Sequence, residues 1–191
     1  MTERKKELLA SSQQVLKNKG YAATSVRDIA KALSMEPASL YSHFENKEDI
    51  LKLTCFEMAD KFDLAIKEVN DIYFNAEEKL RMAVKLHVQL LTKNLDAAII
   101  FIRDWRNLTG ESLTSFISKR NSYEEGIREI VQNGIDEGLF NETDKKFAAL
   151  TILSSVNWIV EWYNKDGSLT PEQIAEKLSN FILTGLKKDT L

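Results

Sequence analysis

Apolar side chains recur every three or four residues along most of the chain, which is the spacing that gathers them on one face of an α-helix. In residues 3–18, for example, Leu8, Val15 and Leu16 share a side with the small Ser12. The same spacing predicts about nine helices, at residues 3–18, 26–33, 37–43, 46–72, 76–93, 96–108, 111–137, 144–164 and 171–187.

Helix-breaking residues fall between these segments and are otherwise scarce. The 191 residues include only seven glycines and two prolines, and Gly20, Gly110, Gly138 and Gly167 lie at predicted breaks. No run of alternating β-branched residues suggests a strand. The sequence therefore predicts an all-α fold, and its 43% hydrophobic and 29% charged residues are those of an ordinary globular protein.

The chemistry-bearing residues argue against an enzyme. A single cysteine, Cys55, excludes an internal disulfide and a thiolate-rich zinc site. With two histidines, no Gly-rich phosphate loop and no metal-ligand spacing, the sequence predicts neither catalysis nor a cofactor nor a metal site. The charged start MTERKKELLA is unlike a signal peptide, and no apolar run approaches the roughly 20 residues of a membrane span. We therefore expect a cytoplasmic protein with no membrane partner.

Charge is distributed unevenly along the chain, although the net charge is only −3. Residues 1–47 hold eight Lys and Arg against five Asp and Glu, so they carry 8 − 5 = +3 and the remainder carries −6. A basic segment of this kind is compatible with nucleic-acid binding. For Arg4, Lys5 and Lys6, at the start of the chain, DNA contact and ordinary surface exposure both remain open.

Two short predicted helices joined by a tight turn occupy residues 24–47. The turn reads LSME, and Pro37 suits the first position of the next helix, where a missing N–H leaves no carbonyl unpaired. Leu40 and Phe44 can point inward, while small or flat polar side chains point outward. This arrangement is typical of a helix-turn-helix, whose second helix enters the major groove of DNA.

The run TSVRDIAKALSMEPASLYSHFENKEDIL resembles the DNA-binding domain of the TetR family of bacterial transcriptional regulators. That family carries a GYxxTSxxDIA run followed, after the turn, by LYxHFxxKExL. The residues in register are Gly20, Tyr21, Thr24, Ser25, Asp28, Ile29, Ala30, Leu40, Tyr41, His43, Phe44, Lys47 and Glu48. The resemblance implies an N-terminal helix-turn-helix domain at residues 1–47. A C-terminal helical domain for ligand binding and dimerisation would then occupy residues 48–191.

The resemblance also implies which residues contact DNA. They are Thr24, Ser25, Arg27, Pro37, Ala38, Ser39, Tyr41, Ser42, His43 and Lys47. Two positions depart from the family pattern. Ser34 stands where the turn usually has Gly, so a left-handed backbone there would cost about 1 kcal/mol. Glu36 replaces the usual small cap residue, which places a negative charge near the DNA.

The C-terminal helices imply a dimer and an effector pocket. Residues 144–164 and 171–187 carry apolar faces large enough to pair with a second copy in a four-helix interface. The runs FIRDWRNL and NWIVEWYNKDGSLTPEQIAE resemble a TetR branch that responds to fatty acyl-CoA, and Arg103 or Arg106 could meet a charged head group. The expected ligand-binding residues are Phe62, Ile66, His87, Leu90, Phe101, Trp105, Tyr123, Ile127 and Trp158.

Together these features predict a homodimeric, ligand-responsive regulator, most simply a repressor, that binds a near-palindromic operator and is released by a small apolar ligand such as an acyl-CoA or fatty acid. Two alternatives stay open. One is a DNA-binding helical dimer without small-molecule control. The other is a ligand-binding protein whose helix-turn-helix has degenerated at Ser34 and Glu36.

Overall fold

The computed structural model describes residues 1–188, and packing divides the chain into two units. Unit 1 contains Met1–Ala59 and Asn94–Ile117, and unit 2 contains Asp60–Lys93 and the residues from Ser118 onward. The helices α4 (Lys47–Asp71) and α7 (Gly110–Asp136) each contribute residues to both units. The domain boundary expected from the sequence, between residues 47 and 48, divides the chain at a single point and differs from these two units. It stays a prediction.

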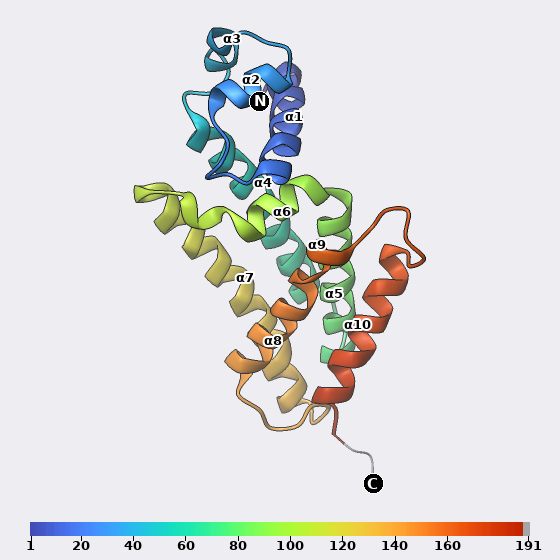
Figure 1. The fold of residues 1–191 in the computed structure, drawn as a ribbon. Coiled ribbons are helices and arrows are strands. Elements are labelled where there is room, and N and C mark those ends of the chain that lie inside the picture. The colour runs from blue at the N-terminus through green and yellow to red at the C-terminus, as the bar shows by residue number, and fades with distance from the viewer. Residues whose placement is uncertain (189–191) are drawn as a thin grey trace. The chain divides into compact units, whose positions relative to one another are not determined.

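Unit 1 is built on one apolar core. Its other elements are α1 (Glu3–Lys19), α2 (Val26–Ala32), α3 (Pro37–Tyr41), α6 (Leu95–Arg103) and the 3-10 helix η1 (Trp105–Asn107). Leu16, Ile29 and Leu40, one from each of the first three helices, are fully buried in this core. Figure 1 shows these helices gathered about the start of α4. The sequence therefore folds the helix-turn-helix onto its inward-facing residues, as the periodicity requires.

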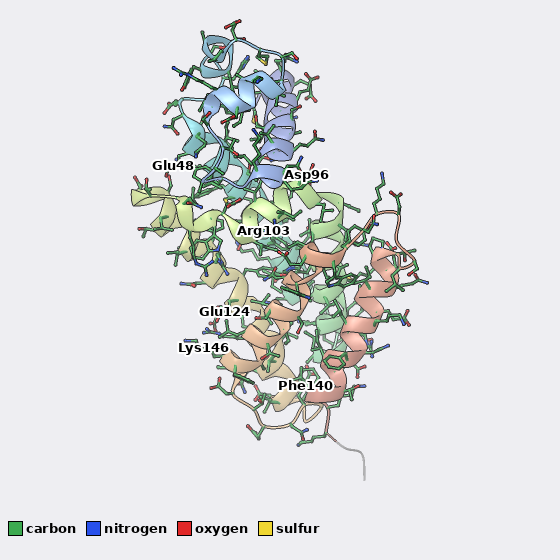
Figure 2. All side chains as sticks on the ribbon, viewed as in Figure 1. Glu48, Asp96, Arg103, Glu124, Phe140 and Lys146 are labelled. Carbon is green, nitrogen blue, oxygen red and sulfur yellow. The ribbon has the colours of Figure 1, made fainter. Side chains whose placement is uncertain are left out.

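A partly buried ion pair joins α1 to α6 within unit 1. Lys17 Nζ lies 2.7 Å from a carboxylate oxygen of Asp96, which Figure 2 labels. Elsewhere in unit 1, the Glu48 carboxylate on α4 accepts hydrogen bonds from the backbone N–H and the hydroxyl of Thr109. The N-terminal helices are thus tied by specific polar contacts to later parts of the chain.

The described elements of unit 2 are also helices, apart from one isolated β-bridge between Phe140 and Lys187. Besides the ends of α4 and α7 it contains α5 (Ala76–Lys93), α8 (Lys145–Asn157), α9 (Ile159–Trp162) and α10 (Pro171–Leu186), and α5 packs along α10. The fully buried Phe140 lies where the chain leaves α7 (Figure 2). A Cβ at Gly134 would lie 2.1 Å from the Phe140 ring, so only glycine permits this approach.

The all-α prediction is confirmed over residues 1–188, and each predicted helix is found near its expected position. Three boundaries differ. The predicted helix at 144–164 is interrupted at Trp158, and the one at 96–108 ends at Arg103 before η1. The third helix ends at Tyr41 rather than at residue 43 or 44. Helical spacing continues through these short turns, so periodicity alone does not reveal them. No described helix has the length and apolar character needed to cross a membrane.

Candidate nucleic-acid interface and effector site

The first helix of the candidate DNA-binding motif begins at a capping box. The Ser25 hydroxyl accepts a hydrogen bond from the Asp28 backbone N–H at 3.1 Å, and the Asp28 carboxylate accepts one from the Ser25 N–H at 2.9 Å. The Ser25 hydroxyl also donates to the Asp28 carboxylate, and this bond, the one from the Ser25 N–H and the nearby Lys19 lower the pKa of Asp28 to about 2. The carboxylate therefore stays ionised and fixes the start of α2 next to the exposed Arg27.

The turn between α2 and α3 is a Schellman motif with Ser34 at its left-handed position. The Ser34 N–H donates to the Lys31 carbonyl at 3.1 Å, and the Met35 N–H donates to the Ala30 carbonyl at 2.9 Å. Ser34 has φ = 54°, and it is the one positive-φ residue other than glycine in the described part of the chain. The departure noted in the sequence therefore leaves the turn intact but places a serine in a strained conformation.

The second helix, α3, presents small and flat polar groups. Leu40 is fully buried beneath it, whereas the Tyr41 side chain is 51% exposed. Ala38, Ser39 and Ser42 are also exposed, and the Ser42 hydroxyl donates to the Ser39 carbonyl at 2.7 Å. The expected contact residues Pro37 and His43 are half-buried at either end of this surface.

Two further expected DNA-contacting residues, Thr24 and Lys47, are engaged with backbone carbonyls inside unit 1. Thr24 is 2% exposed, and its hydroxyl donates to the Gly20 carbonyl at 2.7 Å. Lys47 Nζ donates to the backbone carbonyls of Tyr21 and Thr24, both at 2.8 Å, and lies 4.1 Å from the centre of the Tyr21 ring. In this structure both side chains stabilise the loop between α1 and α2. The family motif gave no sign of this role for Lys47.

Unit 2 encloses a polar triad among apolar side chains. His87 Nδ1 lies 2.8 Å from the Tyr123 hydroxyl, and His87 Nε2 lies 3.1 Å from Asn157 Oδ1. Because an amide oxygen only accepts, Nε2 carries the proton and Nδ1 accepts from Tyr123. Burial lowers the pKa of His87 to about 4, so the imidazole is neutral at pH 7. Burial also disfavours the charged form of Tyr123 and so raises the pKa of its hydroxyl.

The other expected ligand-binding residues fall into separate groups. Phe62 packs on the triad, with its ring centre 4.5 Å from that of His87 and 5.2 Å from that of Tyr123. Three more expected ligand-binding residues belong to unit 2: Ile66 and Ile127 are buried, and Leu90 is half-buried. Phe101 and Trp105 belong to unit 1, where both rings pack against Phe116. Arg106, one candidate for a charged head group, stacks over the Trp105 ring at 4.5 Å.

Trp158 is 65% exposed and belongs to an apolar surface rather than to an interior. Phe147, Leu150 and Trp158 follow a helical spacing that places them on one side of α8 and its C-terminal cap. The exposed Trp162 and Phe181 add apolar area from α9 and α10. The sequence indicated aromatic residues here but could not tell which of them face outward. Within residues 1–188 no group of His, Cys, Asp and Glu could hold a metal ion.

Comparison with known proteins agrees with this architecture. The family model described as "Bacterial regulatory proteins, tetR family" matches residues 8–53, and "Tetracyclin repressor-like, C-terminal domain" matches residues 74–186. The HTH-type transcriptional repressor KstR2 of Mycobacterium tuberculosis is 24% identical over 191 residues, which is 99% of this chain and 96% of that protein. The solved structure of that KstR2 has the same fold, with a TM-score of 0.93.

Two further solved structures are more similar in sequence. The TetR family transcriptional regulator PfmR from Thermus thermophilus is 30% identical, with 95% of this chain and 99% of that chain covered and a TM-score of 0.85. AibR, solved in complex with isovaleryl coenzyme A and operator DNA, is also 30% identical, with 94% and 97% covered and a TM-score of 0.83. This chain therefore belongs to the TetR family of bacterial transcriptional regulators, which are DNA-binding proteins and not enzymes.

Proposed function

We propose that this protein is a dimeric, ligand-responsive transcriptional repressor that binds a near-palindromic operator in the cytoplasm and leaves it when a small apolar ligand binds. The observation that carries the proposal is the surface of α3. Its inner side closes the core of unit 1 through Leu40, while Ala38, Ser39, Tyr41 and Ser42 remain exposed. Small side chains allow the helix backbone to approach base edges, and a phenol at its end can donate to a phosphate.

Dimerisation is supported by the exposed apolar residues of α8 to α10. Large apolar patches on a soluble protein are usually covered by a partner. Phe147 and Phe181 are 69% and 79% exposed, and the segment between them adds Trp158. A two-fold dimer would present two α3 helices to half-sites about one turn of DNA apart, roughly 34 Å. This separation is why we expect a near-palindromic operator.

An acyl-CoA or fatty acid is the effector that we favour. AibR, at 30% identity, was solved with isovaleryl coenzyme A and operator DNA. In this chain, the apolar surroundings of His87 and Tyr123, where the Phe62 ring packs on both side chains, would suit an acyl chain. A ligand that binds better to the DNA-free form shifts the population toward it, and a coupling of about 1–3 kcal/mol is enough.

A direct test is binding to the DNA upstream of the protein's own gene, measured by fluorescence anisotropy over a range of salt concentrations. Phosphate contacts predict an affinity that falls steeply as salt increases. Tyr41→Phe should weaken binding about tenfold, since it removes a hydrogen bond to a charged phosphate. Tyr73→Phe is a matched control, because Tyr73 is fully exposed in unit 2. Equal affinities for both variants would contradict the proposed role of α3.

The effector is tested separately with a series of acyl-CoAs and free fatty acids of increasing chain length. The proposal expects at least one of them to raise the melting temperature and to release DNA. If none does so while DNA binding is intact, the protein is a DNA-binding dimer without small-molecule control. If ligand binds but no DNA does, the helix-turn-helix is degenerate.

A further inference from the structure

The carboxylate of Glu36 is the exposed charged group at the start of α3. Glu36 is the N-cap of this helix, with φ = −70° and ψ = 139°, and its backbone carbonyl accepts from the N–H groups of Ser39 and Leu40. Its side chain makes no capping hydrogen bond. Within residues 1–188 it also has no ion pair, so the carboxylate is available to a partner outside the chain.

The proposed DNA-binding function would bring this charge close to the DNA. Figure 1 shows α3 at the end of unit 1 opposite α6. In a helix-turn-helix, the N-terminal residues of the second helix contact base edges, while phosphates are met by flanking groups. A carboxylate is repelled by phosphates, so a favourable contact requires a hydrogen-bond donor on a base. In the major groove the donors are the amino groups of cytosine and adenine.

Cytosine fits the carboxylate better than adenine does. The adenine amino group lies beside the acceptor N7, which repels a second carboxylate oxygen, whereas cytosine presents its N4 amino group next to a C–H edge. The remainder of α3 offers no stronger base reader, because residues 34–45 contain no Arg, Lys, Asn or Gln. The Ser42 hydroxyl is already bonded to the Ser39 carbonyl.

We propose that Glu36 is a specificity-determining residue that accepts a hydrogen bond from cytosine N4 at one symmetric position in each operator half-site. The inference rests on the proposed DNA-binding function and assigns to it one base and one side chain. It also gives a function to the departure from the family pattern at this position.

The proposal predicts a change of base preference on substitution. Glu36→Gln replaces the acceptor pair by an acceptor and a donor, which match adenine N6 and N7 respectively. Glu36→Ala removes the reader altogether. Glu45→Gln is the matched control, because Glu45 is also exposed and follows the buried Phe44, but it lies beyond the end of α3.

The experiment is selection of bound duplexes from a randomised pool, followed by anisotropy on the enriched sequence and its single-base variants. The wild type should enrich cytosine at the symmetric position and disfavour other bases there about 10- to 100-fold. Glu36→Gln should enrich adenine at that position alone, and Glu36→Ala should lose the preference. Glu45→Gln should keep the wild-type motif.

Two results would overturn the inference, and they differ from each other. If Glu36→Gln and Glu45→Gln both bind every sequence more tightly with unchanged base preference, Glu36 contributes only charge repulsion. If the wild-type protein enriches no sequence at all, the proposed DNA-binding function fails and this inference fails with it.

Discussion

Replacing Ser34 by glycine should stabilise the protein, because Ser34 holds the left-handed position of the α2–α3 turn. At φ = 54° its Cβ is crowded by the adjacent backbone, which costs an L-amino acid about 1–2 kcal/mol. Both hydrogen bonds of the turn come from backbone N–H groups, those of Ser34 and Met35, so the substitution leaves them in place. The Ser34 side chain is exposed, and its loss uncovers no core residue.

The expected gain is smaller than the strain, because glycine also gives the unfolded chain more freedom. That entropic effect is about 0.4–1 kcal/mol and opposes the relief of strain. The net increase in the free energy of unfolding should therefore be about 0.5–1 kcal/mol. For a chain of 150–250 residues, 1 kcal/mol corresponds to about 2–4 °C, so the melting temperature should rise by about 1–4 °C.

Urea denaturation followed by circular dichroism measures this difference, with Ser42→Gly as the matched control. Ser42 is also exposed and near α3, but it has φ = −68°. Glycine there relieves no strain, loses the hydroxyl bond to Ser39 and should destabilise by about 0.5–1 kcal/mol. Opposite signs for the two variants are the expected result. A loss of stability in Ser34→Gly similar to that in Ser42→Gly would refute the left-handed assignment and the reasoning built on it.

Four other substitutions test the remaining geometry. Gly134→Ala should destabilise the fold by about 1–3 kcal/mol in thermal melts, because its Cβ would lie 2.1 Å from the buried Phe140 ring. Gly185→Ala, a helical position with open space around it, should instead stabilise the fold by about 0.5–1 kcal/mol. Lys47→Met should lower the free energy of unfolding by about 1–2 kcal/mol, since two loop carbonyls lose their charged donor; unchanged stability with weaker DNA binding would instead assign Lys47 to phosphate. The pKa of His87 is lowered from 6.5 to about 4 in the folded state. Below pH 6.5 the unfolded state therefore binds a proton at His87 that the folded state does not bind, and the free energy of unfolding falls as the pH drops from about 6.5 to about 4. Between pH 7.5 and 5.5 this loss should be about 1.4 kcal/mol, and urea titrations of His87→Gln should lack that share of the pH dependence.

The helix-turn-helix could be predicted from the sequence because the residues that determine it act locally. Helical periodicity, the cap at Ser25 and the proline at position 37 act within one or two turns, and the structure has α2 and α3 where these signals indicate. Even the strain at Ser34 followed from one residue type in a turn of known geometry. Which residues contact DNA remains a prediction, although the exposed face of α3 is compatible with it.

Hydrogen bonds between residues distant in the sequence could not be predicted from helical periodicity. Lys47 donates to carbonyls 26 and 23 residues earlier in the chain, and His87 meets Tyr123 and Asn157 from two other helices. The sequence placed His87 among the expected ligand-binding residues but could not identify its hydrogen-bond partners. Likewise Trp158 was expected in a pocket, and the end of α8 presents it at the surface.

The sequence alone therefore determined that this is an all-helical TetR-family chain with a paired-helix DNA-binding motif. Only the tertiary structure decided which buried polar groups meet, that Lys47 serves the α1–α2 loop, and that Glu36 keeps a carboxylate without a capping hydrogen bond. The physical reason is range. Backbone geometry and capping depend on neighbouring residues, whereas the rotation of each helix about its own axis is set by packing against residues distant in the chain.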